Sequence, residues 1–208
     1  MNAPLLWYFA DPMCSWCWGF APTIETLQET YRQRLKIALV LGGLRSDSIP
    51  QSPAQREEIL HHWREVHARS GQPFRFEGAM PAGFVYDSEP PCRAVLTAGS
   101  LDAELTFPMY RAIQSAFYAE GRDVTRPDIL TDLAADQGLD RSAFVRAFDS
   151  DELRGRVKAH FSHARRAGVR GFPTLILQQG DKLHLVSHGW QPLAQIRSRL
   201  ETQLDGAG

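Results

Sequence analysis

The sequence predicts an α/β protein in which the two halves of one small sheet are separated by a large all-helical insertion. Three observations lead to this fold class. A strand–helix–strand pattern covers residues 5–44, helical periodicity dominates from residue 54 onward, and strand patterns return after Gly168. The 208 residues therefore divide into an N-terminal βαβ part, a helical insertion and a C-terminal ββα part, which we place at residues 1–45, 46–155 and 156–208.

The first part has the pattern of a βαβ unit. The run "LLWYFA" (5–10) is short and apolar and is stopped by Asp-Pro, as expected for a buried strand followed by a turn. Apolar residues recur every three to four positions over residues 15–34, which predicts a helix that Pro22 should kink or interrupt near its start. The continuous apolar run 36–44 predicts a second buried strand. In a βαβ unit the two strands should be parallel and the crossover right-handed.

The middle of the chain is predicted to be helical and the end to contain a hairpin. Helical periodicity is found in the segments 54–69, 91–101, 104–121, 126–137, 140–149 and 151–168. The stretch 71–92 is rich in Pro and Gly and predicts a long loop, a kind of segment that is more often functional than idle. After it, "PTLILQQGDKLHLVSHGW" (173–190) predicts two strands joined at Gly-Asp, followed by a closing helix over 192–204.

Composition excludes several classes of protein. Hydrophobic residues make up 43% of the chain, and 23 basic residues nearly balance 24 acidic ones. This balance gives no indication of nucleic acid or a membrane surface as a partner. The N-terminus lacks the basic region of a signal peptide, and no apolar run approaches the ~20 residues that span a bilayer. We therefore expect a cytoplasmic protein, whose thiols are mostly kept reduced.

Two of the three cysteines lie close together in "DPMCSWCWGF" (11–20), directly after the first predicted strand. Cys14 is predicted at the exposed N-terminal end of the first helix, where unpaired N–H groups and the helix dipole stabilise a thiolate. Cys17 lies one turn deeper. We expect Cys14 to form a mixed disulfide with the substrate and Cys17 to resolve it. Asp11 should oppose thiolate formation if it is close and ionised.

Other interpretations of the cysteines must be weighed. A zinc site would need two more ligands, and the seven histidines show no matching pattern, so no metal is expected. Two inert core cysteines at this spacing are also conceivable. Cys92 follows two prolines and is interpreted as a small buried residue at a helix start, with a transient bridge to Cys14 as the alternative. Aromatic and apolar residues are candidates for a rim around the thiols: Met13, Trp16, Trp18, Phe84 and Tyr86.

A second candidate part of the site is "GVRGFPTLIL" (168–177). Proline cannot donate to a sheet ladder, so Pro173 belongs to a turn or an edge at the start of the strand. A cis bond between Phe172 and Pro173 would expose the backbone N–H and C=O of Phe172, which could then pair with an extended peptide. The residues alone leave open the simpler alternative of a trans proline that begins a strand.

The segments "YFADPMCSWCWGF", "CRAV" and "GVRGFPTLIL" together resemble the DsbA-like branch of the thioredoxin superfamily, and within it the cytoplasmic FrnE-like proteins. The resemblance implies a thioredoxin-like fold with a large all-helical insertion. It also implies that Cys14 is the nucleophile, that Cys17 is the resolving cysteine, and that Pro173 is a cis-proline facing them. Phe172 then meets the substrate through its backbone, with Trp16 and Met13 as further substrate-binding residues.

The resemblance implies a thiol–disulfide oxidoreductase, with isomerase activity as a variant, that acts on protein or peptide thiols and disulfides. No bound cofactor is expected, and glutathione can serve as a redox partner. The alternative is a glutathione- or dithiol-dependent enzyme for small molecules, of the 2-hydroxychromene-2-carboxylate isomerase, kappa glutathione transferase or polyketide isomerase type. A non-catalytic adaptor is disfavoured because binding alone needs neither Cys14 nor Cys17. The Ser-Trp pair between the cysteines differs from the Pro-His of periplasmic DsbA enzymes, so their strongly oxidising character is not carried over.

Overall fold

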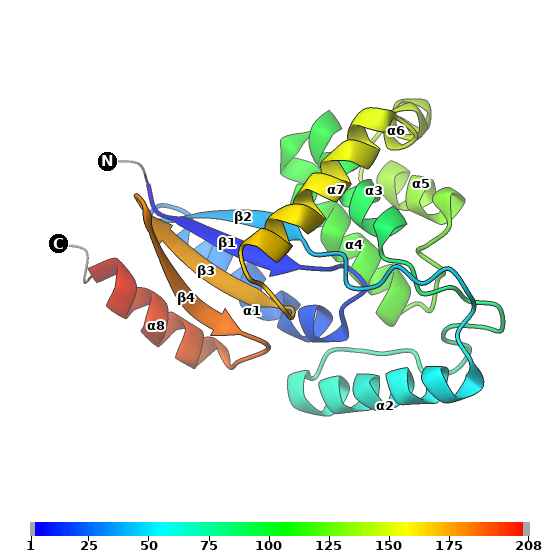
Figure 1. Cartoon of the computed structure of the whole chain (residues 1–208), viewed down its shortest axis with the longest axis horizontal. Coiled ribbons are helices and arrows are strands. Elements are labelled where there is room, and N and C mark those ends of the chain that lie inside the picture. Colours follow the sequence, from blue (N-terminus) through cyan, green and yellow to red (C-terminus); the bar gives the residue numbers. More distant parts are fainter. Residues whose placement is uncertain (1–2, 206–208) are drawn as a thin grey trace.

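The computed structural model describes residues 3–205 and contains a four-stranded mixed sheet in the order β2-β1-β3-β4 (Figure 1). The strands are β1 (Leu5–Ala10), β2 (Lys36–Leu41), β3 (Thr174–Gln179) and β4 (Lys182–His188). β1 pairs with β2 in parallel and with β3 antiparallel, while β3 and β4 form an antiparallel hairpin. β1 therefore joins segments of the chain that lie far apart in sequence.

The helices are distributed unevenly around this sheet. α1 (Ser15–Tyr31) connects β1 and β2, and α8 (Leu193–Asp205) follows β4 and contacts it. Between β2 and β3 lie α2 (Pro53–Ser70), α3 (Glu89–Leu101), the 3₁₀ turn η1 (Ala103–Leu105), α4 (Thr106–Tyr118), α5 (Pro127–Asp136), α6 (Arg141–Phe148) and α7 (Asp151–Arg166). Figure 1 shows α3–α6 gathered beyond one end of the sheet, with α2 set apart from them. The predicted α/β fold with a helical insertion is confirmed.

Pro22 does not interrupt α1, so the prediction of a break near its start was wrong: the helix continues to Tyr31. Proline lacks the N–H that would bond the carbonyl four residues earlier, at Trp18. That carbonyl instead accepts a hydrogen bond from the Gln72 side-chain amide, at 2.9 Å. A residue of the loop after α2 thus supplies the missing donor and keeps the helix intact.

The sheet and the inserted helices both contribute to one large hydrophobic cluster. Its buried members include Tyr8 of β1, Trp63 of α2 and Tyr110 of α4. α7 is continuous across residue 155 and contacts both β2 and α3. The division of the chain at residues 45 and 155 therefore stays a prediction about its organisation. Among residues 3–205, no helix is both long enough and apolar enough to cross a bilayer.

Candidate active site

Cys14 is the N-cap residue of α1, at the end of a tight turn after β1. Its backbone N–H donates to the carbonyl of Asp11 at 3.1 Å, and its own carbonyl accepts from the N–H of Trp18 at 3.0 Å. The Cys14 side chain makes no capping hydrogen bond, and the first turn of α1 contains no acidic residue. The sulfur is therefore not used to cap the helix and lies at the positive end of the helix dipole.

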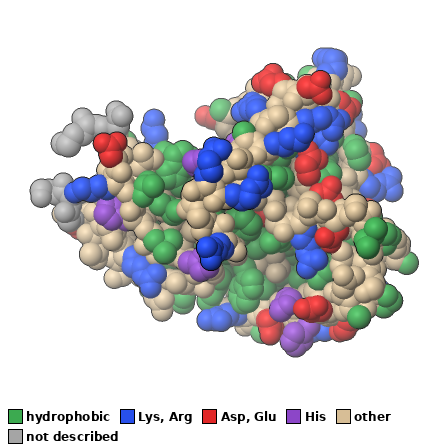
Figure 2. Space-filling view, in the orientation of Figure 1, with side chains coloured by type: hydrophobic (Ala, Val, Ile, Leu, Met, Phe, Trp, Pro, Cys, Tyr) green, Lys and Arg blue, Asp and Glu red, His purple; other side chains and the backbone are tan. Residues whose placement is uncertain are grey.

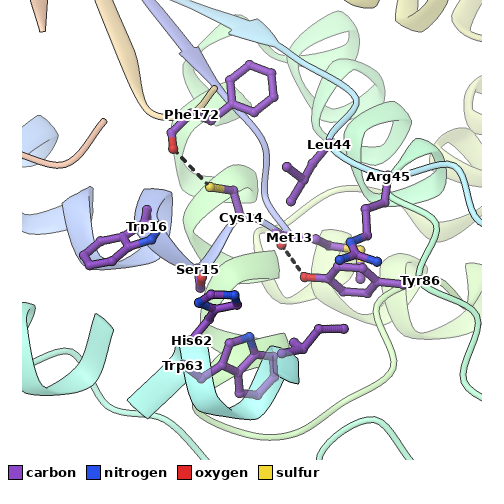
Figure 3. A pocket seen from close by; sticks show the side chains of 11 residues that line it. Met13, Cys14, Ser15, Trp16, Leu44, Arg45, His62, Trp63, Tyr86 and Phe172 are labelled. Carbon is purple, nitrogen blue, oxygen red and sulfur yellow. Dashed lines mark hydrogen bonds between the residues drawn. The ribbon is translucent and has the colours of Figure 1, made fainter. Parts of the chain in front are cut away.

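The Cys14 sulfur borders a cavity of about 290 Å³ (Figure 3). Only 5% of Cys14 is exposed, so the expectation that it lies at the exposed end of its turn was wrong. The segment after β2, the helix α2 and the loop before β3 enclose the sulfur, and Figure 2 shows hydrophobic side chains in the hollow between α7 and α2. The cavity is lined by Met13, Cys14, Ser15, Trp16, Leu44, Arg45, Ile59, His62, Trp63, Tyr86 and Phe172.

The loop before β3 meets the sulfur directly. The peptide bond between Phe172 and Pro173 is cis, as the resemblance implies. The Cys14 thiol donates a weak hydrogen bond to the carbonyl oxygen of Phe172, with 3.6 Å between sulfur and oxygen. The aromatic ring of Phe172 packs on Gly42, where a Cβ would stand 1.9 Å from the ring. Gly42 therefore permits the close approach of this loop to the end of β2.

Cys17 lies below Cys14 in the first turn of α1 and is fully buried. Burial raises the pKa of the Cys17 thiol, and the neighbouring Cys14 raises it further. Cys17 therefore keeps its proton while Cys14 is the sulfur that meets the cavity. This arrangement places one thiol at the cavity and a second, fully buried thiol one helical turn deeper.

Asp11 lies fully buried behind the dithiol. Its carboxylate accepts the N–H of Met13 at 2.9 Å and the N–H of Leu44 at 2.7 Å, and so ties the turn after β1 to the segment after β2. The Cys92 thiol also donates to this carboxylate, at 3.5 Å. Burial raises the pKa of Asp11, against the opposing effect of the two N–H donors. Its charge in turn contributes to the raised pKa of Cys17.

The structure brings most of the predicted site residues to one place. Cys14, Met13, Trp16 and Phe172 line the cavity, whereas Cys17 and Pro173 are buried beside it. Two residues that were expected in the rim around the thiols do not line the cavity, so the prediction was wrong for them. Trp18 stacks on Tyr118, and Phe84 stacks on Phe117, because both belong to the aromatic core between the inserted helices and α1.

Sequence reasoning missed the wall of the cavity that faces Cys14. Leu44 and Arg45 come from the segment after β2, while Ile59, His62 and Trp63 come from α2. The positions of Leu44 and Arg45 could have been predicted from the expected sheet. Two adjacent parallel strands end at the same edge of a sheet, so residues that follow β2 must lie near the turn that follows β1. Within residues 3–205, no three His, Cys, Asp or Glu side chains are arranged to hold a metal ion.

Known proteins with similar sequences and structures belong to the DsbA-like family. Residues 6–201 match the DSBA-like thioredoxin domain family. A crystal structure of a candidate protein disulfide isomerase from Nitrosomonas europaea is 43% identical, with a TM-score of 0.93 and 100% of both chains covered. The cytosolic disulfide reductase DsbM from Pseudomonas aeruginosa is 33% identical, with a TM-score of 0.82 and coverage of 98% of this chain and 100% of that one. DsbM has also been solved with glutathione.

A more distant curated relative is the ClpXP adapter protein SpxH of Halalkalibacterium halodurans. It is 23% identical over 82% of this chain, which spans only 57% of the length of that protein. The family match, in contrast, extends over nearly the whole described fold, from β1 into α8. The chain therefore belongs to the DsbA-like family of thioredoxin-fold proteins.

Proposed function

We propose that the protein is a thiol–disulfide oxidoreductase that exchanges disulfides with protein or peptide substrates through Cys14 and Cys17. One observation carries this proposal: the Cys14 sulfur borders a cavity at the N-terminus of α1, with the carbonyl of Phe172 in front of it and a second, buried thiol one turn deeper. The relatives described as a disulfide isomerase and a disulfide reductase support the same class of reaction.

The proposed exchange uses only the two thiols of the chain and needs no bound cofactor. When the partner carries the disulfide, the Cys14 thiolate attacks it, forms a mixed disulfide and releases one partner thiolate. The Cys17 thiol then loses its proton and attacks the Cys14 sulfur, which forms the Cys14–Cys17 disulfide and releases the second partner thiol. This sequence reduces the substrate disulfide, and oxidation of a substrate dithiol is the reverse sequence. The two electrons pass between the dithiol and the partner, and each released thiolate takes up one proton.

We place this activity in the cytoplasm, with glutathione as the redox partner. DsbM is described as cytosolic and has been solved with glutathione. These descriptions concern DsbM, and at 33% identity they support the same location and partner for this chain.

Replacement of Cys17 tests the proposal. In Cys17→Ser, the mixed disulfide that forms between Cys14 and one cysteine of a disulfide-bonded peptide should persist, because the resolving thiol is absent. Turnover should fall by at least ~100-fold. Intact mass spectrometry detects the added peptide, and reduction should remove it. A Cys17→Ser variant that turns over a small-molecule substrate at the wild-type rate, without a trapped intermediate, would instead support the isomerase or transferase alternative.

A further inference from the structure

The cavity next to Cys14 carries charge of one sign. Among the described residues that line it, none is acidic, and Arg45 is the one that is always positively charged. His62 also lines it, but this side chain is half exposed and already lies 3.3 Å from the carboxylate of Glu65. Most of the other lining side chains are apolar or aromatic. A partner that places a negative charge in this cavity would therefore meet Arg45.

The Arg45 guanidinium is positioned by its neighbours. It lies over the ring of Tyr86, 5.0 Å from the ring centroid. The Tyr86 hydroxyl donates to the carbonyl of Met13, the residue before Cys14, so the ring has a defined place relative to the sulfur. Figure 3 shows Arg45 and Tyr86 together on one side of Cys14, with Trp16 on the opposite side. The distance between the guanidinium and the sulfur is thus set by packing.

Arg45 retains hydrogen-bonding capacity for a ligand. Among the described residues, the guanidinium makes a single hydrogen bond, from Nη1 to the carboxylate of Asp47, and this contact is long at 3.4 Å. A guanidinium has five N–H donors and can bind a carboxylate through two parallel hydrogen bonds. The side chain is 38% exposed, so the remaining donors face solvent and the cavity. Arg45 can therefore bind an incoming anion without leaving its place on Tyr86.

The depth of Cys14 restricts the size of the partner. Cys14 is only 5% exposed, and α2 contributes Ile59, His62 and Trp63 to the wall opposite it. The cavity volume of about 290 Å³ is at the lower end of the range of small-molecule sites, roughly 300–1,000 Å³. A small thiol or disulfide reaches this sulfur more readily than a disulfide within a folded protein.

We propose that Arg45 binds a carboxylate of a small thiol or disulfide of the glutathione type and thereby selects anionic, low-mass redox partners for Cys14. This inference rests on the proposed function and names the partner class of the same site. With glutathione disulfide, Cys14 attacks one sulfur while Arg45 holds a carboxylate of that half. The attack releases one glutathione, and closure of the Cys14–Cys17 disulfide releases the second. Two thiols of the protein are oxidised as one disulfide is reduced to two thiols.

The test compares two disulfides that differ in charge. The reduced protein is mixed with glutathione disulfide or with neutral bis(2-hydroxyethyl) disulfide, and the oxidation rate is followed by acid quenching, alkylation and mass spectrometry. Arg45→Ala should lower the ratio of the two rate constants (anionic over neutral) about five- to tenfold, as expected for a half-exposed ion pair. Arg45→Lys should retain most of this ratio because the charge remains.

Two controls keep the result interpretable. Arg64→Ala removes an equal charge from α2 outside the cavity, where Arg64 pairs with Glu57, and should leave the ratio within about twofold of wild type. Arg45→Gln keeps most of the side-chain bulk over Tyr86 and should behave like Arg45→Ala. An equal loss with both disulfides, or a ratio unchanged in Arg45→Ala and Arg45→Gln, would overturn the inference while leaving the proposed function intact. A wild-type protein that is oxidised by neither disulfide would overturn the proposed function itself.

Discussion

Cys14 and Cys92 occupy similar local positions but have different surroundings. Each lies at the N-terminal end of a helix, Cys14 as the N-cap of α1 and Cys92 in the first turn of α3, and each is buried. The Cys14 sulfur borders a cavity and a backbone carbonyl. The Cys92 sulfur is fully buried and donates to the carboxylate of Asp11.

The electrostatic environments of the two sulfurs differ accordingly. Burial raises the pKa of Cys92, and the negative charges of Asp11 and Glu89 raise it further. Glu89 lies in the first turn of α3, whereas the first turn of α1 has no acidic residue. A helix N-terminus therefore does not by itself make a cysteine reactive. Access to a partner and the charges around the sulfur decide whether a cysteine can react.

The largest expected effect is the difference in exchange rate between a Cys14 variant and a Cys92 variant. Cys14→Ser should abolish disulfide exchange, with a loss of at least ~1,000-fold, because the attacking sulfur is gone. Cys92→Ala should keep the exchange rate within about twofold and lower the free energy of unfolding by about 1 kcal/mol, through loss of a buried side-chain atom and its hydrogen bond. Turnover of a disulfide-linked fluorescent peptide measures the first effect, and urea unfolding measures the second.

The same pair of variants tests the alternative role of Cys92. If Cys92 forms a transient bridge with Cys14, Cys92→Ala should slow exchange more than tenfold at a temperature where the variant is fully folded. Alkylation mass spectrometry of the partly oxidised wild-type protein should then also reveal a peptide that contains Cys92 in a disulfide. We expect neither result, because the buried Cys92 thiol is hydrogen-bonded to the Asp11 carboxylate.

The position of the Phe172 carbonyl, which faces Cys14, should depend on the absence of a side chain at Gly42. A Cβ at Gly42 would stand 1.9 Å from the ring of Phe172, so Gly42→Ala must displace the loop whose carbonyl lies 3.6 Å from the Cys14 sulfur. We expect the exchange rate to fall about tenfold or more, because small displacements at a reacting group have large effects on rate. The second-order rate constant for oxidation by a small disulfide measures this.

A second substitution and a control distinguish a displaced Phe172 loop from a nonspecific effect of replacing a glycine. Gly42→Ala combined with Phe172→Ala removes the clash and should recover most of the lost rate, since the backbone carbonyl remains. Gly155→Ala lies in α7, where an added Cβ would meet nothing within 4 Å, and it should leave the rate unchanged. If the double variant is as slow as Gly42→Ala alone, the position of the Phe172 loop is not what Gly42 controls.

The sequence predicted the half of the site that depends on local pattern. An apolar run stopped by Asp-Pro located the turn that holds Cys14, and the cysteine spacing placed Cys17 one turn deeper in α1. The opposite half depends on how distant segments pack. Trp63 could be recognised as a buried residue from its helical spacing, but the docking of α2 against α1 decides that it also borders the cavity. For the same reason, the burial of Cys14 could not be read from the residues around it.

The smallest expected effect concerns Asp11, which contacts both regions: its backbone carbonyl accepts the N–H of Cys14, and its carboxylate accepts the thiol of Cys92. Burial raises the pKa of Asp11 in the folded protein above the unfolded value. The stability that this shift contributes is therefore fully present below about pH 4, where the unfolded carboxyl is also protonated, and is lost as the pH rises through the folded pKa. Asp11→Asn removes the titration, so the free energy of unfolding of wild type minus that of Asp11→Asn should decrease from pH 4 to pH 7 in urea titrations. A difference that instead increases with pH would mean that the two backbone N–H donors outweigh burial and hold Asp11 as a stabilising carboxylate.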